Sequence, residues 1–278
     1  MRGSESRPGP ADQAHRFLTL HRPGDPLLMP NPWDAGSARL LAFLGFEALA
    51  TTSSGHAATL GRLDGTVSRD EAIAHARSIV EATDLPVSAD LENGFADEPE
   101  AVAETVRQAV ASGLAGCSVE DSTGREDDPI FDAALARDRV AAAAEAAHAG
   151  PVHLVLTARA ENLLHGRSDL GDTIARLQSY QEAGADVLYA PGLTAAEDIG
   201  RVVASVDRPV NVLARPGCPP VAELAALGVS RISVGGAFAY AALGALAGAA
   251  RELREEGTYG FWDGAGTGVE AARSAFGP

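Results

Sequence analysis

The feature that most constrains this 278-residue chain is an alternation of two kinds of segment, repeated eight times from residue 27 onward. Short apolar or β-branched runs, typical of buried parallel strands, are each followed by a longer Ala/Leu-rich segment with helical spacing. The predicted strands are Leu27–Met29, Ala48–Thr52, Val87–Ala89, Gly116–Val119, His153–Thr157, Val187–Tyr189, Val210–Leu213 and Arg231–Val234. The predicted helices are Ala35–Leu44, Arg69–Ala82, Glu100–Ser112, Asp132–Ala149, Gly171–Ala183, Ala195–Ser205, Val221–Leu227 and Tyr240–Glu256.

Eight such units favour a closed (β/α)₈ TIM barrel. An open doubly wound sheet would more often show fewer strands and a glycine-rich phosphate fingerprint after the first strand, which this chain lacks. Start and stop signals support the predicted helices. They are Ser68 and Thr194 as N-caps, Pro99 in a first turn, and Gly113, Gly184 and Gly228 as C-terminal breaks.

We expect residues 11–257 to form a single barrel domain, because α/β barrels of this length normally fold as one unit. Residues 1–10 are polar and Gly/Pro-rich, which predicts a disordered tail and not a signal peptide. An additional helix is predicted at about Asp12–His21, at the bottom of the barrel. The Gly-rich residues 258–278 predict a C-terminal extension that is loosely ordered or depends on a partner. Without an apolar run of membrane-spanning length, a cytoplasmic protein with no membrane partner is expected.

Charge excludes several classes of function. The formal net charge is −16, and every basic residue except histidine is an arginine, because the chain contains no lysine. An acidic chain without a basic cluster would repel a phosphate backbone, so no nucleic acid partner is expected. The absence of lysine excludes Schiff-base chemistry and pyridoxal phosphate enzymes, which need a side-chain amine.

The chain has two cysteines, Cys117 and Cys218, which are too few for a cysteine-based zinc site or a disulfide framework. Both are interpreted as buried thiols.

Polar residues occur where the predicted strands end, at the edge where such barrels place their active sites. Acidic residues at the ends of the third and fourth strands, Asp90, Glu92 and Glu120, would repel each other without a cation between them. Oxygen-only ligation suits Mg²⁺, with Mn²⁺ as the alternative, and some of these acids would act through water. The structural alternative is that they cap helices or pair with arginines at the barrel rim.

Arg159 closes the fifth strand on the same edge, where its planar guanidinium could bind a substrate carboxylate with two hydrogen bonds. Its structural alternative is a salt bridge to Glu120 or Glu161. Ser53, Ser54 and Gly55 would present hydroxyl and backbone N–H groups to an anion, although this composition is also ordinary for a loop. The histidines show no metal-ligand spacing, and no role is predicted for His56, His75, His148, His153 and His165.

Several segments, taken together and in order, resemble the isocitrate lyase/phosphoenolpyruvate mutase superfamily. They run from about residue 27 to 257 and comprise Asn-Pro-Trp-Asp-Ala-Gly-Ser-Ala-Arg-Leu at 31–40, Ser-Ser-Gly at 53–55, Leu-Gly-Arg-Leu-Asp-Gly at 60–65, Asp-Leu-Glu-Asn-Gly at 90–94, Val-Glu-Asp at 119–121 and Ala-Arg at 158–159. The resemblance implies an α/β barrel with Mg²⁺. It also implies a homo-oligomer, usually a dimer of dimers that exchange the last helix between subunits.

The resemblance also implies a role for each matching residue. Asp90 resembles the direct metal ligand, and Glu92 and Glu120 resemble the acids that hold metal-bound waters. Asp64 resembles an acid on a mobile gating loop, which with Glu120 and Arg159 completes the implied catalytic set. The implied substrate contacts, to carboxylate and oxo oxygens, come from Ser53, Ser54, Gly55, Arg159 and Asn211.

The chain departs from the superfamily after its fourth strand. Isocitrate and methylisocitrate lyases carry a Lys-Lys-Cys-Gly-His loop whose cysteine acts as general acid or base, whereas this chain has Ser-Thr-Gly-Arg-Glu-Asp-Asp at 122–128. Cleavage of isocitrate or methylisocitrate is therefore not expected. The phosphoenolpyruvate mutase loop, Glu-Asp-Lys with a following Asn-Ser, is also missing, which weakens phosphonate chemistry.

The predicted function is a Mg²⁺-dependent lyase or hydrolase that cleaves a C–C bond in a small 2-oxo or 2-hydroxy (di)carboxylate through an enolate. Oxaloacetate hydrolases and dimethylmalate lyases are enzymes of this type. One alternative is C–P chemistry, as phosphoenolpyruvate phosphonomutase or phosphonopyruvate hydrolase. A second is a non-catalytic member that binds a metabolite, although such a protein would have no need of the predicted metal site.

Overall fold

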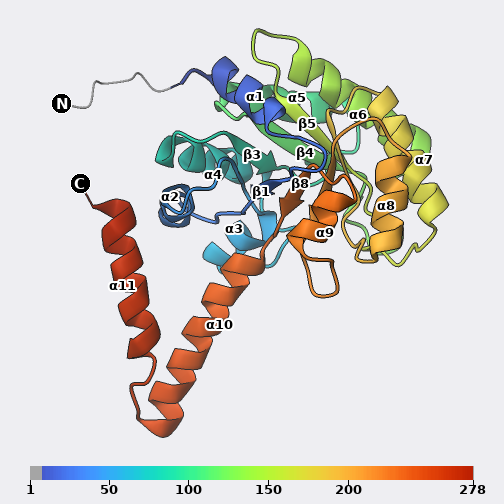
Figure 1. Cartoon of the computed structure of the whole chain (residues 1–278). Helices are drawn as coiled ribbons and strands as arrows, with labels where there is room; N and C mark the ends of the chain where they lie inside the picture. The colour runs from blue at the N-terminus through green and yellow to red at the C-terminus, as the bar shows by residue number, and fades with distance from the viewer. Residues whose placement is uncertain (1–7, 278) are drawn as a thin grey trace.

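A computed structural model describes residues 8–277 of the chain. All eight predicted strands are present and pair in parallel, in the order β1-β8-β7-β6-β5-β4-β3-β2 (Figure 1). The TIM-barrel prediction is confirmed. The strands are β1 (Leu27–Met29), β2 (Leu49–Ala50), β3 (Val87–Asp90), β4 (Gly116–Glu120), β5 (Val155–Arg159), β6 (Val187–Tyr189), β7 (Val210–Leu213) and β8 (Arg231–Ser233).

Asn31 joins the two strands at which the barrel closes, β1 and β2. The Ala50 N–H donates to the Pro30 carbonyl at 3.1 Å across this seam. The buried Asn31 side chain then donates to the Thr51 carbonyl at 3.0 Å and accepts from the Val234 and Gly235 N–H groups at 3.0 and 2.9 Å. One amide therefore ties together the carboxyl ends of β1, β2 and β8.

Helices connect the strands and cover the outside of the barrel (Figure 1). Ser68 forms a capping box with Glu71, and Pro99 occupies the first turn of its helix, as predicted. The helix predicted with Thr194 as N-cap begins instead after Ala195. The helices are α1 (Pro10–Thr19), α2 (Ala35–Phe43), α3 (Ser53–Thr59), α4 (Arg69–Ala82), α5 (Pro99–Ala111), α6 (Ala133–His148), α7 (Leu170–Glu182), α8 (Ala196–Ala204), α9 (Val221–Ala226), α10 (Ala237–Arg251) and α11 (Trp262–Phe276).

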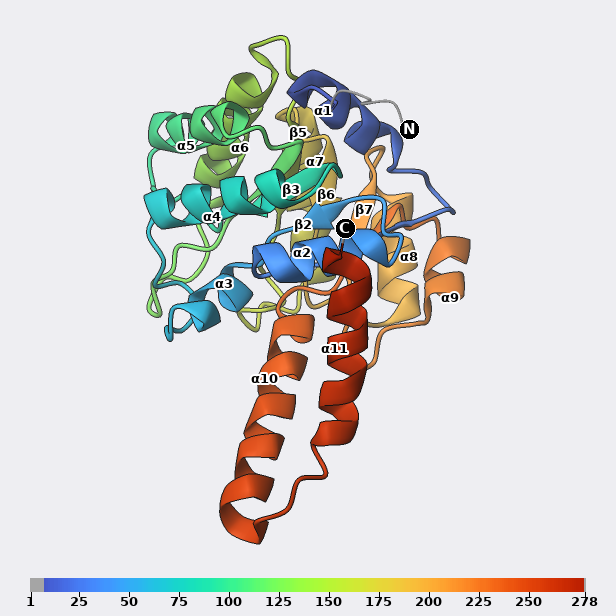
Figure 2. The same ribbon diagram turned by 90° about the vertical axis from the view of Figure 1, so that its left-hand side faces the viewer.

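Helix α1 closes the amino-terminal end of the barrel, opposite α3 and α10 (Figures 1 and 2). Its Phe17 side chain is fully buried and packs with Leu27, Met29 and Val155. A Cβ atom at position 116 would lie 2.7 Å from the Phe17 ring, so the close approach requires the glycine found there. A disordered tail was predicted for residues 1–10. Residues 1–7 of that prediction lie outside the described part of the chain, and Pro10 is already the first residue of α1.

The C-terminal region forms an arm that projects from the barrel (Figure 2). Helix α10 continues through a π-helical turn, Glu252–Glu256, after which α11 returns and contacts α2. Residues 258–278 were expected to be loosely ordered or partner-dependent; fifteen of them, Trp262–Phe276, form α11. No helix within residues 8–277 is long and apolar enough to cross a membrane.

Candidate active site

The barrel encloses a cavity of about 210 Å³ that opens at the carboxyl ends of the strands. Its wall includes Ser53, Ser54, Asp64, Asp90 and Arg159 near the opening, and Ser118, Asn211 and Arg231 from within the barrel. A second, more open cavity of about 370 Å³ continues outward over Glu92, Glu120 and Glu161. The two share Ser53, Asp64 and Arg159, so most of the predicted site residues surround one continuous space.

Arg159 lies at the centre of the acidic rim. Its guanidinium pairs with Asp90, Glu120 and Glu161, each at 2.9 Å, and its side chain is only 14% exposed. Burial alone would lower the pKa of Arg159, but the three carboxylates raise it well above its usual range. The structural alternative considered for Arg159, pairing with Glu120 or Glu161, is therefore present in the structure, with Asp90 as a further partner.

Asp90 ends β3 and keeps part of its carboxylate open to the cavity. One oxygen accepts from Arg159 and, at 3.3 Å, from the Glu92 N–H. Within residues 8–277, the other oxygen accepts a single hydrogen bond, a long one of 3.3 Å from the Ser53 N–H. The Asp90 backbone N–H donates to the Thr51 hydroxyl at 2.9 Å, which fixes the end of β3 against β2.

Glu92 has an unusual backbone for its residue type, with a φ of 48° in the left-handed region that favours glycine. Buried Arg139 holds this loop by donating to the carbonyls of Asn93, Ala96 and Asp97. The Glu92 carboxylate has no hydrogen-bond or ion-pair partner among residues 8–277. Burial, together with the charges of Asp90 and Asp64, raises the pKa of Glu92 to about 7. Backbone strain therefore presents an unpaired acid to the outer cavity.

Glu120 and Glu161 flank Arg159 from β4 and from the segment after β5. Burial raises the pKa of Glu120 well above its usual value, despite the attraction of Arg159, and burial also raises the pKa of Glu161. Glu161 is positioned through its backbone N–H, which donates to buried Asp121 at 2.8 Å. Asp121 in turn accepts from Tyr180 at 2.7 Å and pairs with Arg176 at 3.1 Å.

The predicted serine–glycine segment forms the first turn of α3, a helix that was not predicted. Ser53 and Ser54 line the cavity, and Thr52 caps the helix by accepting from the Gly55 N–H at 3.4 Å. Gly55 itself is buried away from the cavity wall, where a Cβ atom would lie 2.5 Å from Thr52. Asp64 follows α3 in an exposed loop but reaches both cavities, and burial raises its pKa.

The base of the inner cavity is formed by a buried cation, Arg231. It donates to Asn211 at 2.9 Å, to Thr157 at 3.1 Å and to His21 at 3.2 Å, all uncharged acceptors. No carboxylate among residues 8–277 pairs with it, and burial lowers the pKa of Arg231 to about 9. Asn211, predicted to contact substrate, thus lines the cavity while holding Arg231 and donating to Ser233 at 3.0 Å.

The loop at 122–130 covers one side of the outer cavity. It is closed by a bridge between Ser122 and Ile130, and Arg125 ties it to Asp97 at 2.8 Å. Ser122 and Gly124 line the cavity, and the Ser122 hydroxyl lies 3.3 Å from His165. Neither cysteine serves the site, since Cys117 is buried with its pKa raised to about 12 and Cys218 donates to the Leu213 carbonyl at 3.3 Å.

The donor set of the rim fits a hard divalent cation. Asp64, Asp90, Glu92, Glu120 and Glu161 offer oxygen atoms alone, and Arg159 is the single basic side chain that faces the outer cavity among the described residues. Such an excess of negative charge raises carboxylate pKa values unless a cation neutralises it. Asp90, with one oxygen nearly free, and unpaired Glu92 are the residues best placed to hold Mg²⁺ directly or through water.

Fold and site together define a (β/α)₈-barrel protein with an acidic, cation-type site at the carboxyl ends of its strands. A family model described as phosphoenolpyruvate phosphomutase matches residues 17–254. The chain belongs to this family, within the isocitrate lyase/phosphoenolpyruvate mutase superfamily.

Relatives in this family differ in what they are described to do. An uncharacterized protein of Mycobacterium tuberculosis, Rv1998c, is 34% identical over 86% of this chain and 89% of its own. A crystal structure of a protein provisionally described as a lyase/mutase, from Burkholderia cenocepacia J2315, is 55% identical over 91% of each chain, with a TM-score of 0.88. Oxaloacetate acetylhydrolase, solved with its product oxalate, is 25% identical over 96% of this chain and 95% of its own, with a TM-score of 0.85. Other matches are named 2-methylisocitrate lyase and 2,3-dimethylmalate lyase.

Two features of the site were not predicted. Arg231 was placed at the start of a strand without a role, because inward and outward positions of a short buried strand do not differ in the sequence. Glu161 was considered only as a partner of Arg159. Its position two residues beyond a strand, like that of Glu92 relative to Asp90, is the one signal that could have identified it.

Proposed function

We propose that this protein is a Mg²⁺-dependent lyase or hydrolase that cleaves a C–C bond in a small 2-oxo or 2-hydroxy (di)carboxylate. The observation that carries the proposal is the pairing of an oxygen-only carboxylate rim with a buried, unpaired cation, Arg231, at the base of the same cavity. The rim suits a divalent cation, and the base suits an anionic substrate. The cavity volume of about 210 Å³ suits a molecule of a few carbon atoms.

Such a cleavage places a negative charge beside a carboxylate. A proton leaves the 2-hydroxyl group or an attacking water, the C–C bond breaks, and its electron pair remains as an enolate that is then protonated. Bound Mg²⁺ would supply Lewis-acid stabilisation of the developing charge. Arg159 would orient the substrate oxygens and add positive charge at the rim, and Ser53 and Ser54 would donate hydrogen bonds from the first turn of α3.

Some of the relatives support carbon chemistry, whereas the family model and another matching structure are described as a phosphomutase and a phosphonomutase. The oxaloacetate acetylhydrolase structure holds its product oxalate, a small dicarboxylate, and the enzyme's name describes cleavage of oxaloacetate, which is a 2-oxo dicarboxylate. The loop at 122–128 carries neither a cysteine nor a lysine, which disfavours the acid–base chemistry expected for isocitrate-type substrates. Asp64, on the loop after α3, would close over the bound substrate and exclude water.

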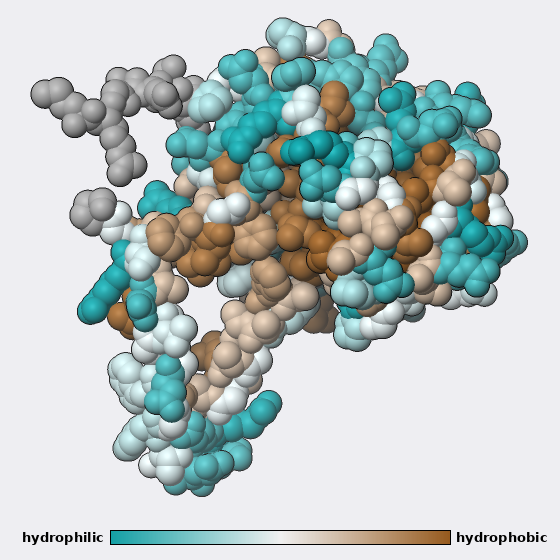
Figure 3. Space-filling model, in the orientation of Figure 1, coloured by the Kyte–Doolittle hydropathy of each residue, from teal (hydrophilic) through white to brown (hydrophobic). Residues whose placement is uncertain are grey.

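We further propose that the protein is a homo-oligomer whose C-terminal arm packs on a second copy. The arm exposes Tyr240, Leu243, Leu246 and Trp262, with exposed fractions of 52%, 43%, 65% and 64%. Figure 3 shows apolar surface along α10 that is continuous with apolar surface beside the barrel. A projecting arm with this much exposed apolar area would be stabilised by burial against another subunit.

A substrate panel tests the enzyme proposal. Purified protein with Mg²⁺, and then with chelator, is incubated with oxaloacetate, alkylmalates, methylisocitrate and phosphonopyruvate while pyruvate and oxalate release is followed. We expect turnover of one carbon-only substrate that chelator abolishes. Turnover of phosphonopyruvate alone would instead establish C–P chemistry.

Asp90→Asn separates the metal role from general damage. Losing this carboxylate should weaken Mg²⁺ binding by roughly tenfold or more, about 1.4 kcal/mol, and reduce turnover in parallel. Glu98→Gln, a neutralisation at an exposed residue of the same connection, is the matched control and should bind Mg²⁺ like the native protein. Unchanged Mg²⁺ affinity and turnover in Asp90→Asn contradict the proposal.

A further inference from the structure

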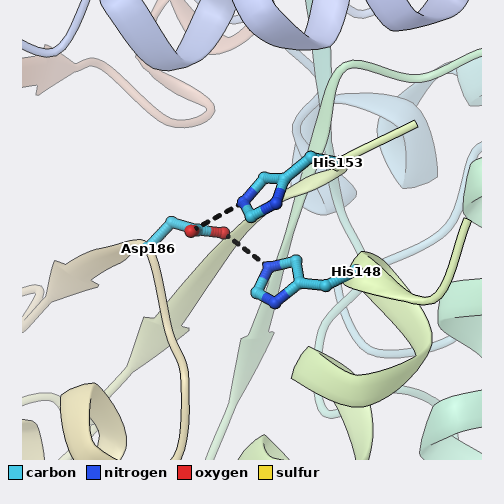
Figure 4. A group of neighbouring side chains, drawn as sticks. All are labelled: His148, His153 and Asp186. Atoms are coloured by element: carbon cyan, nitrogen blue, oxygen red, sulfur yellow. Dashed lines mark hydrogen bonds and ion pairs between the residues drawn. The ribbon is translucent and has the colours of Figure 1, made fainter. Parts of the chain in front are cut away.

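A second group of ligand-type side chains lies at the end of the barrel opposite the acidic rim. His148 is the last residue of α6, His153 precedes β5, and Asp186 precedes β6. Since β5 and β6 are parallel neighbours, residues before them meet at the same amino-terminal edge. Figure 4 shows both imidazoles directed at the Asp186 carboxylate. No role was predicted for either histidine, because the third member lies more than thirty residues away in the sequence.

The three side chains of this group point toward one another. The Nε2 atom of His148 lies 3.0 Å from one Asp186 oxygen, and that of His153 lies 2.9 Å from the other. The two rings stack with centroids 4.0 Å apart and planes 10° apart. One ligand atom from each residue lies within 4.8 Å of the others. Ligands of a tetrahedral ion with bonds near 2.0–2.1 Å lie about 3.3 Å apart, so small side-chain rotations suffice.

We propose that His148, His153 and Asp186 form a binding site for a Zn²⁺-type transition metal, separate from the acidic rim. Two imidazoles and one carboxylate are the donors that Zn²⁺, Co²⁺ and Ni²⁺ prefer over Mg²⁺. On binding, each ring moves its proton from Nε2 to Nδ1, and the ion takes the position between the three side chains. Water completes the coordination, since the His153 side chain is 48% exposed.

The neighbouring residues bury and orient the Asp186 carboxylate for metal binding. Its side chain is only 10% exposed, and one oxygen accepts from the Leu156 backbone N–H at 2.8 Å. A hydrogen bond of this kind orients a ligating carboxylate. The metal would join the end of α6 and the irregular segment 149–154 to the edge of β6. The amino-terminal face of such barrels contributes to stability more than to catalysis, so the site is a structural clamp.

Titration with Co²⁺ tests the site in the full-length protein, with excess Mg²⁺ present to occupy the acidic rim. We expect the native protein and Asp90→Asn to bind one equivalent of Co²⁺ with the visible absorption of a nitrogen-ligated ion. His148→Gln/His153→Gln should lose that equivalent and its spectrum. His165→Gln, a histidine change at the other end of the barrel, should retain both.

A thermal measurement distinguishes loss of the metal site from misfolding of the variant. Zn²⁺ should raise the melting temperature of the native protein and leave that of His148→Gln/His153→Gln unchanged. The single change His153→Gln, at a half-exposed position where glutamine keeps a donor for Asp186, preserves the fold and should still abolish the shift. Equal Co²⁺ stoichiometry and spectra in native protein and double variant would overturn the proposal and leave a hydrogen-bonded triad.

Discussion

A few individual side chains place negative charge at the opening of the barrel and positive charge at the base of its cavity. The rim holds Asp90, Glu92 and Glu120 around Arg159, whereas the base holds Arg231 among uncharged partners. Burying a cation without a counter-ion costs free energy, so we expect the positive charge of Arg231 to serve the cavity that it lines. On the proposed function, Arg231 would attract anions into the cavity, and the rim would attract cations to its opening.

Replacing Arg231 tests its electrostatic contribution. Arg231→Met removes the charge at nearly constant volume and should raise the KM of an anionic substrate by roughly tenfold, about 1.4 kcal/mol. Arg231→Lys keeps the charge and should raise KM less. Steady-state kinetics on the substrate found in the panel measures both. Native KM in Arg231→Met would show that the cation acts on the fold alone.

The lowered pKa of His21 predicts how the free energy of unfolding depends on pH. Burial, and then Arg231, lower the pKa of His21 from 6.5 to about 3, against the opposing effects of the Phe17 and Leu18 backbone groups and, more weakly, of Asp186. Its Nε2 accepts from Arg231, so its Nδ1–H donates to the Phe17 carbonyl at 2.8 Å and the ring is neutral. Below pH 6.5 and down to about 3, the unfolded chain binds one more proton than the folded protein. Stability therefore falls by about 1.4 kcal/mol for each unit of pH that is lost across this window.

The variant His21→Gln isolates this effect from other titrating groups. Glutamine offers both a donor and an acceptor but does not titrate. Urea unfolding at pH 6.5 and at roughly pH 5 should show a loss of stability that is smaller in the variant by about 2 kcal/mol. Equal losses in the two proteins would exclude His21 as the acid-sensitive group.

Individual site residues were predictable to different degrees. Asp90, Glu120 and Arg159 were placed correctly at the opening because each ends a strand, and strand ends share one edge of a barrel. The ion pairs between them were anticipated only in part, since the sequence does not reveal how far a side chain reaches across the rim. Gly55 matched a motif, but its position depends on packing against Trp33 and Ala239, which no local pattern reveals.

At the scale of elements, α1 acts as a plug for the amino-terminal end of the barrel. The strands were predicted well because buried parallel strands are short, continuous apolar runs. Helix α3 was not predicted, since its seven residues carry Ser, Gly and Thr in place of an apolar stripe. An additional helix at the bottom of the barrel was predicted at about Asp12–His21, and its contact with Gly116 became visible only in three dimensions.

Phe17→Ala measures the contribution of the plug. The side chain is fully buried, so its loss should destabilise the protein by about 3–5 kcal/mol in chemical unfolding. His15→Ala, an exposed aromatic on the same helix, is the matched control and should change stability by about 0.5 kcal/mol or less. Similar losses in both variants would mean that α1 acts through helix formation and not through core packing.

The whole molecule combines a well-packed barrel with a C-terminal arm, α10 and α11, whose side chains are mostly exposed. Among the residues of α10, only Ala239 is buried, and α11 contains no buried residue. Figures 2 and 3 show the arm extending beyond the barrel with apolar surface on it. We expect the folded unit in solution to be larger than one chain.

Charge placed on the arm tests the assembly. Leu243→Glu/Leu246→Glu should convert the native oligomer to a monomer in light scattering coupled to gel filtration, because buried unpaired charges oppose association. Val221→Glu, at an apolar residue of α9 that is 45% exposed, is the control and should leave the molar mass unchanged. A monomeric native protein at micromolar concentration would refute the assembly.

The acidic rim has a kinetic consequence. Any dicarboxylate that reaches Arg231 passes the acidic rim, where Asp64 and Glu92 have no salt-bridge partner among the described residues and repel it when they are ionised. On the proposed function, a bound divalent cation would neutralise this charge, so we expect the substrate to bind after the metal. The charge at this entrance therefore predicts an ionic gate: without the cation, a substrate titration should show little binding, and chelator added during a reaction should prevent further substrate from entering.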